Sequence, residues 1–266
     1  MKKYLLAFMG LFMVLDANAA GVVLSDTDAS GDVQAESNNY YNSGYIQDVL
    51  STDSSDPLFL VADNSFLSDT SVYYMDNTLT LGQYIGYGIN RIFVLHANIN
   101  YQFDFTHEKG NGFSATEFGG TYRMNEGTGS MQIISDALFG VKVGGSSHVR
   151  TPGYARSTYY AGLRFGRQFT AVTLAGTVKS TWIFDDARGL SYIDFIPEMY
   201  FRFKYDLRGG IGADFRKSTN PYLLPNQEWL NFKLLRQFGN TQYVGHVDYE
   251  FEEEEFRFGM DIKILF

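Results

Sequence analysis

The residues of this chain that could do chemistry are charged side chains that recur at every second position of otherwise apolar stretches. Arg257, Asp261 and Lys263, for example, alternate with bulky apolar residues close to the end of the sequence. Successive side chains of a β-strand point to opposite faces, so these charges would share one face. Opposite charges on neighbouring strands can pair with one another or line a path for polar solutes. The pattern indicates electrostatic binding or passage rather than covalent catalysis.

Similar charged faces recur along much of the chain, and they hold nearly equal numbers of acids and bases. Because each strand would contribute one such face, we expect these side chains to gather in a common polar lumen. The candidate lumen-lining residues are His96, Asp104, Arg123, Lys142, Arg164, Lys179, Asp194, Glu198, Arg202, Lys204, Asp214, Arg216, Lys233, His246, Asp248, Glu250, Arg257, Asp261 and Lys263.

The lengths of two connections predict partners for some of these charges. A four-residue loop at 252–255 would place Glu250 opposite Arg257 and His246 opposite Asp261, because loop length sets the register of a hairpin. We therefore expect two ion pairs between the last two strands.

A tight turn at residues 239–240 extends this row to a third strand. It would place Lys233 beside His246 and Asn231 beside Asp248. Two interpretations of such a row stay open. The charges stiffen a narrow lumen, or they form a polar constriction that selects small solutes.

Residues suited to covalent chemistry are few and lie in expected loops. Ser146, Ser147 and His148 are adjacent in sequence, and neighbours seldom supply both a nucleophile and its base in the required geometry. The pairs at 107–108 (His-Glu) and 185–186 (Asp-Asp) lie in other loops. With 4 His and no Cys, a metal site would need carboxylates. We assign no catalytic residue, metal or cofactor, and keep a lipid- or peptide-cleaving enzyme as an alternative.

The elements that must position these residues are strands, because alternation with a period of two is a strand signature. Several runs reach eleven to thirteen residues, whereas strands of soluble β-sandwiches average about five or six. An exported soluble β-sandwich is therefore the weaker alternative. The expected strands are 78–89, 93–105, 117–124, 133–143, 159–166, 172–184, 193–205, 210–216, 229–234, 245–251 and 256–266.

Short and long connections alternate between these strands. This alternation is typical of an up-and-down sheet in which all short turns lie at one end and all long loops at the other. The count of eleven strands leaves the first strand without its antiparallel predecessor, and single-chain bacterial barrels have even strand numbers. We therefore predict a twelfth strand near 66–75, turning at Asp76 and Asn77. Barrels of ten or eight strands remain alternatives.

The final strand ends on an aromatic residue. A terminal strand of alternating apolar residues that closes on Phe resembles the assembly signal of Gram-negative outer-membrane β-barrels. The resemblance implies an all-β, transmembrane, antiparallel β-barrel in the outer membrane, with membrane lipid and the barrel assembly machinery as partners. The residues that carry it are Phe256, Phe258, Met260, Ile262, Ile264 and Phe266.

The amino-terminal end fits an exported protein. Lys2 and Lys3 precede a twelve-residue apolar run at 4–15, and an Ala-Asn-Ala cleavage pattern follows at 17–19. This order is typical of a secretory signal peptide, and the run is too short to cross a membrane. We expect a cleaved signal peptide at residues 1–19.

The next segment is acidic. Residues 20–77 hold ten acids and no Lys or Arg, although the net charge of the whole chain is only −9. We expect residues 20–65 to be a mostly disordered periplasmic extension or a plug, and residues 66–266 to form the barrel. One hypothesis docks the apolar patch at 58–61 in the barrel mouth, near Arg202 and Lys204. The acidity argues against a nucleic-acid partner.

Together these features predict a porin-like channel or transporter for small solutes. The apolar faces would meet lipid, because Lys or Arg there costs about 2–4 kcal/mol near the midplane. A barrel of about twelve strands is wider than a filled eight-stranded barrel and narrower than a sixteen-stranded porin. The alternative from another class is a non-conducting barrel that serves as a structural protein or displays its loops.

Overall fold

The computed structural model describes residues 54–106, 111–127, 133–145, 157–184, 189–203, 207–222 and 224–266. The chain divides into two compact units, Met1–Val49 and Leu50–Phe266, and all described residues belong to the second. The expected signal peptide at 1–19 and most of the expected extension lie outside the described residues. So do Lys204 and the loop residues at 107–108, 146–148 and 185–186.

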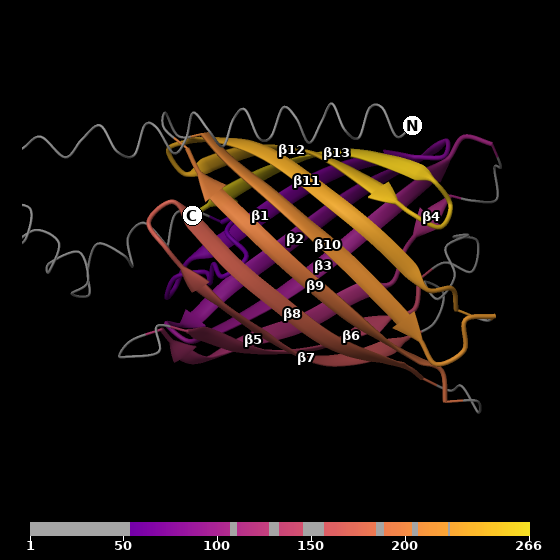
Figure 1. The fold of residues 1–266 in the computed structure, drawn as a ribbon, viewed down its shortest axis with the longest axis horizontal. Coiled ribbons are helices and arrows are strands. Elements are labelled where there is room, and N and C mark those ends of the chain that lie inside the picture. Colours follow the sequence, from indigo (N-terminus) through magenta and orange to yellow (C-terminus); the bar gives the residue numbers. More distant parts are fainter. Residues whose placement is uncertain are drawn as a thin grey trace, which may run out of the picture. The chain divides into compact units, whose positions relative to one another are not determined.

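The second unit is one antiparallel sheet that closes on itself. β1 pairs with β2 on one side and with the last strand, β13, on the other, so the wall has no free edge. Figure 1 shows the strands tilted to the axis of this wall. The strands are β1 (Phe66–Met75), β2 (Thr78–Asn90), β3 (Phe93–Asp104), β4 (Gly112–Phe113), β5 (Thr116–Glu126), β6 (Ile134–Val143), β7 (Thr158–Gln168), β8 (Val172–Ile183), β9 (Ser191–Arg202), β10 (Leu207–Ser218), β11 (Gln227–Phe238), β12 (Thr241–Glu250) and β13 (Glu255–Leu265).

The prediction of a twelve-stranded all-β barrel is confirmed. Of the 13 strands, β4 is a two-residue strand that pairs only with β3, which leaves twelve in the wall. The weakly alternating segment before residue 78 is β1. Asp76 and Asn77 turn the chain with φ angles of 41° and 57°, and Asp and Asn are the non-glycine residues that best tolerate this left-handed conformation.

The two faces of the wall differ sharply in polarity. Phe258 and Met260 on β13 are 53% and 59% exposed, whereas the inward carboxylates of Asp136 and Asp194 are completely buried. Apolar side chains therefore cover the outside and charged side chains line the inside. Among the described residues, no helix is long and apolar enough to cross a membrane.

Strand β11 shows why alternation underestimates strand length. The pattern predicts a strand at 229–234, but β11 extends to Phe238. At Leu235 the pattern inverts: this apolar side chain points inward and is buried with Tyr200 and Val244, while Arg236 follows on the outer face. The barrel interior thus contains a small apolar cluster that the rule of a polar inside does not anticipate.

The predicted register is right for one hairpin and wrong for the next. Lys233 pairs with His246 and Asn231 pairs with Asp248 between β11 and β12, as the tight turn at 239–240 predicts. Arg257, however, lies opposite Asp248 instead of Glu250.

The register differs because the turn after β12 comes one residue earlier than expected, at 251–254. Glu250 pairs with Glu255, and Glu254 has a left-handed φ of 57° that ends the turn. Asp261 therefore lies opposite Val244 rather than His246. The His246 side chain still approaches Asp261 diagonally, with Nε2 and Oδ1 3.4 Å apart.

The two ends of the barrel are distinct. The carboxy-terminal rim is the end that holds Phe266, whose backbone exchanges hydrogen bonds of 2.8 and 3.0 Å with Phe66. The short turn at 239–240 lies at this rim, because Leu265 N donates to Asn240 O. The opposite rim holds the turns at 76–77 and 251–254.

Candidate functional site

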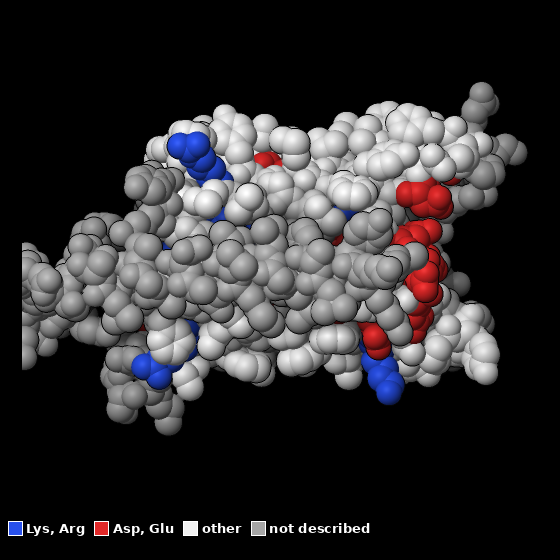
Figure 2. Space-filling view, turned by 45° about the horizontal axis from the view of Figure 1, so that its top comes forward, with Lys and Arg blue, Asp and Glu red and all other residues white. Residues whose placement is uncertain are grey.

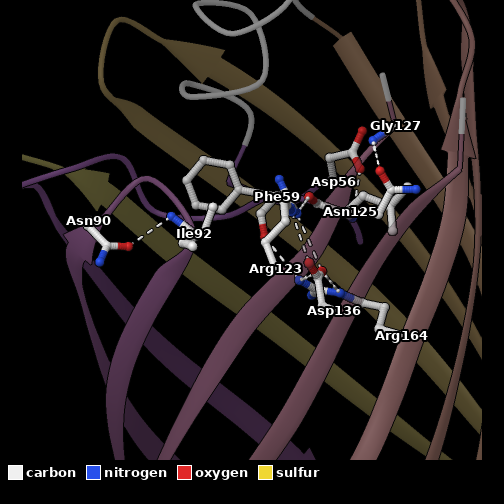
Figure 3. Close-up of polar contacts among 10 residues, drawn as sticks. Asp56, Phe59, Asn90, Ile92, Arg123, Asn125, Gly127, Asp136 and Arg164 are labelled. Carbon is white, nitrogen blue, oxygen red and sulfur yellow. Dashed lines mark hydrogen bonds and ion pairs between the residues drawn. The ribbon is translucent and has the colours of Figure 1, made fainter. Parts of the chain in front are cut away.

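Three adjacent strands build a charged cluster at the lumen wall near the carboxy-terminal rim. The cross-strand register places Arg123 of β5 and Arg164 of β7 on either side of Asp136 of β6. Each arginine Nε lies 2.9 Å from an oxygen of the buried Asp136 carboxylate. Figure 3 shows this arrangement. The carboxylate fixes both guanidinium groups: their Nη2 atoms also contact it, at 3.3 and 2.5 Å, and each Nη2 has a second N–H group.

These second N–H groups hold a segment that is not part of the wall. Arg123 Nη2 donates to the carbonyl of Leu58 at 2.6 Å, and Arg164 Nη2 donates to the carbonyl of Phe59 at 3.4 Å. Figure 3 shows Phe59 beside the two arginines. Because Asp136 neutralises part of their charge, the arginines act here as positioned donors to a peptide backbone. We call residues 54–65 the inner segment.

The inner segment is also held by its own acid, Asp56. One carboxylate oxygen accepts a hydrogen bond from Leu58 N at 2.8 Å, which shapes a local turn. The other accepts from Thr173 Oγ1 at 2.6 Å and forms an ion pair with Arg202. The Asp56 side chain is 1% exposed and that of Arg202 is 12% exposed. A buried carboxylate therefore fixes this end of the segment through groups on β8 and β9.

Further contacts hold the two ends of the inner segment at different strands of the wall. The hydroxyls of Ser54 and Ser55 donate to Gln242 Oε1 of β12 at 3.0 and 2.9 Å. At its other end, Asn64 N donates to Gly88 O of β2 at 2.8 Å. A Cβ atom on Gly88 would lie 1.9 Å from the carbonyl oxygen of Ala62, so the close approach requires glycine.

The two walls that hold this segment face each other. The strands between β2 and β9 are β3, β5, β6, β7 and β8 on one path round the barrel, and β1, β13, β12, β11 and β10 on the other. Asp56 at β9 and Ala62 at β2 thus touch opposite walls. The side chains between them include Leu58 and Val61, which are 1% and 3% exposed. The inner segment crosses the bore.

A second cluster of the same design lies on β8, β9 and β10. Lys179 and Arg216 lie in register on either side of Asp194. Arg216 Nε is 2.7 Å from one carboxylate oxygen and Lys179 Nζ is 3.5 Å from the other. Arg216 also donates to Gln227 Oε1 at 2.9 Å and lies over the ring of Tyr192. All its partners among the described residues belong to the wall.

A third group pairs charges around β12 and β13. His246 lies between two carboxylates, with Asp248 Oδ2 3.4 Å from Nδ1 and Asp261 Oδ1 3.4 Å from Nε2. Arg257 Nε contacts Asp248 at 2.7 Å, and Tyr73 of β1 packs against the imidazole ring. These contacts join neighbouring strands across the seam that closes the barrel.

A fourth group, on β3, β5, β6 and β7, surrounds one glutamate. Glu117 accepts a hydrogen bond from Tyr160 at 2.8 Å, lies 3.3 Å from His96 Nε2 and pairs with Lys142 Nζ at 3.1 Å. Tyr84 stacks on the imidazole of His96. Carboxylate, imidazole, phenol and ammonium groups here satisfy one another within the wall.

The other candidate residues have diverse surroundings. Lys233 pairs with Glu198 at 3.1 Å. Asp104 accepts hydrogen bonds from the backbone and hydroxyl of Thr106 and so shapes a loop. Asp214 is intermediate in exposure, on β10. 

Among the described residues, four acids in the lumen lie outside the candidate set: Glu117 and Asp136, which are described above, and Asp69 and Asp56. Asp69 of β1 pairs with Lys263 at 3.3 Å, and Asp56 pairs with Arg202. These last two belong to the acidic stretch before residue 78, where weak alternation conceals which side chains face inward. The signal that could have found them is local: Lys263 and Arg202 needed partners that the predicted neighbouring strands do not supply.

The lumen therefore holds acids and bases that are largely paired across strands. Figure 2 shows that exposed acids gather instead at one end of the barrel. They include Glu252, Glu253 and Glu254 in the turn at the opposite rim, and Asp76 in the turn after β1. Within the described ranges, no group of three or more His, Asp or Glu side chains is arranged to hold a metal ion.

Comparisons with known proteins match the fold. No protein-family model matches the sequence, and no curated protein matches it. Among solved structures, the KdgM porin is 14% identical, with a TM-score of 0.57 over 74% of this chain and 98% of that one. The NanC porin is 10% identical, with a TM-score of 0.57 over the same shares.

An outer membrane channel from Pseudomonas putida F1 is 9% identical, with a TM-score of 0.53 over 78% of this chain and 97% of its own. At these identities the likeness shows the fold alone. The chain has the twelve-stranded architecture of an outer-membrane β-barrel and is similar to porins and channels of that shape.

Proposed function

We propose that this protein is a porin-like channel of the outer membrane that passes small polar solutes. The observation that carries the proposal is the sorting of side chains across one closed wall: apolar residues cover the outside, and nearly balanced charges line the inside. Such a wall is stable in lipid and offers a polar path through it. The carboxy-terminal rim would face the periplasm and the acidic opposite rim would face outward.

The pairing of charges supports weak rather than strong ion selectivity. Asp136, Asp194 and Glu117 each face basic partners within the wall, so the lumen presents little net charge to a passing ion. The solved porin–oligogalacturonate complex shows that a barrel of this shape in another protein takes an acidic oligosaccharide. The balanced lining of this chain favours small neutral or zwitterionic solutes.

Membrane lipid and the barrel assembly machinery are the partners that this function requires. In support, the apolar side chains of β13 project outward, and Phe266 closes the wall by pairing with Phe66. Removing Phe266 should therefore slow insertion by the assembly machinery more than it alters the folded barrel. The rates of insertion into proteoliposomes with and without the machinery would measure this.

Planar bilayers test the channel. Folded protein, identified by its heat-dependent gel migration, should give discrete current steps with a cation-to-anion permeability ratio near one. A variant whose residues 54–61 are replaced by an equally long Gly/Ser segment is measured in parallel, because the inner segment crosses the bore. If neither folded protein conducts, the proposal is wrong and a structural or loop-displaying barrel becomes the better interpretation.

A further inference from the structure

The inner segment differs from the strands of the wall because its backbone lies inside the bore. It touches opposite walls through Asp56 at β9 and the Ala62 carbonyl at β2, while Arg123 and Arg164 hold its middle. All these contacts lie near the carboxy-terminal rim. Solutes that cross the barrel must pass this level.

We propose that residues 54–65 form an internal gate that closes the periplasmic end of the channel, with Asp56, Thr173 and Arg202 as its latch. This inference rests on the proposed channel function and adds to it a closed resting state. The occupant of the bore is a defined part of the same chain. Opening consists of withdrawing this segment from the lumen, with no change in the wall.

The chemistry of the contacts fits a gate better than a permanent part of the wall. The backbone of the segment is held by side-chain donors at Leu58 and Phe59 instead of a strand ladder. Asp56 forms an ion pair with Arg202 across the bore, and the neighbouring acid Asp63 is exposed. Withdrawal breaks these contacts and the packing of Phe59 and Val61 in a small apolar cluster, but it leaves the strand pairing of the wall intact.

The wall residues that hold the segment keep other partners in the wall when the segment leaves. Arg123 and Arg164 retain Asp136, and Gln242 retains a hydrogen bond of 3.1 Å to Gln237. Arg202 retains a contact of 2.8 Å with Thr173. Each holder of the segment thus has a second partner in the wall, which lowers the cost of an open state.

Single-channel recording of the full-length chain tests the latch. Asp56→Asn removes the charge of the latch but preserves its shape, and it should raise open probability about tenfold, as expected for losing one charge-assisted interaction. Asp63→Asn is the matched control. It removes the same charge from the same segment at an exposed position, and its open probability should equal that of the wild type.

A reversible cross-link keeps the test decisive if Asp56→Asn also loosens the fold. The chain has no cysteine, so Ser55→Cys with Gln242→Cys introduces a single addressable pair at a contact of 2.9 Å. In the Asp56→Asn background, a short bifunctional thiol reagent should return the current to the closed level. Reducing the link should restore the raised current in the same bilayer.

The outcomes separate the gate from the channel. If the wild type, Asp56→Asn and the cross-linked protein all conduct equally, the gate is wrong and the channel stands. If no folded variant conducts, including the Gly/Ser replacement of residues 54–61, the channel itself is contradicted and the gate falls with it. A raised current in Asp56→Asn that the cross-link abolishes supports both.

Discussion

Two clusters of this barrel share a design and differ in what they hold. Asp136 and Asp194 are both completely buried, and each lies in register between two basic residues on adjacent strands. The arginines around Asp136 also donate to backbone carbonyls of the inner segment, whereas the described partners of Arg216 beside Asp194 all lie in the wall. A base–acid–base row therefore serves first to join neighbouring strands. The same row becomes a binding site when a segment reaches its remaining donors.

The largest effect is expected at the shared carboxylate of the first cluster. Asp136→Asn should destabilise the barrel by about 3–5 kcal/mol, because it leaves two largely buried guanidinium groups without a counter-charge. Arg123 and Arg164 are only 10% and 18% exposed, so water cannot replace the carboxylate fully. Urea unfolding in detergent micelles measures the change. A loss below 1 kcal/mol would show that this row is not structural.

A smaller loss is expected at the second cluster. Asp194→Asn should cost about 1–3 kcal/mol, since it removes a charged hydrogen-bond acceptor. Lys179 and Arg216 are each 25% exposed and can turn partly toward water in the lumen. The same unfolding assay measures this change. The open probability of the channel should change only with the substitution in the first cluster. An equal or larger loss than in Asp136→Asn would contradict the ranking by burial.

Two glycine substitutions distinguish displacement of the inner segment from a change in the wall. Gly88→Ala should displace the segment at a cost of about 1–3 kcal/mol, because the new methyl group overlaps the Ala62 carbonyl. Gly245→Ala is the control, with its nearest atom 4.0 Å from the added carbon. Labelling of a cysteine at Ser55 by a membrane-impermeant thiol reagent should accelerate only with Gly88→Ala. Equal labelling rates would mean that the segment is not held at β2.

The smallest effect is expected for an ion pair outside the lumen. Arg91 contacts Glu126 at 2.9 Å, and its side chain is 62% exposed. Arg91→Ala should change stability by less than about 1 kcal/mol, as is usual for exposed pairs. The change should shrink further in high salt, in contrast to Asp136→Asn. Unfolding midpoints at low and high ionic strength compare the two.

The sequence alone is sufficient to predict the strands of the barrel wall. The period-two alternation reports which face each side chain occupies, and the connection lengths require a strand before residue 78, found as β1. Alternation is a local property, so it can be recognised in one strand without knowing which strands lie beside it. It fails where polarity inverts, as at Leu235, and where a turn shifts by one residue, as after Glu250.

What only the tertiary structure decided is which charges meet. The turn after β12 is shifted by one residue, so Arg257 lies opposite Asp248 rather than Glu250. Register depends on turn geometry, which alternation does not encode. The pairing of Asp56 with Arg202 spans 146 residues and arises only when the closed wall gathers its strands around the inner segment. The sequence by itself thus determined a barrel with a charged lumen, and the closure of that barrel decided what lies inside it.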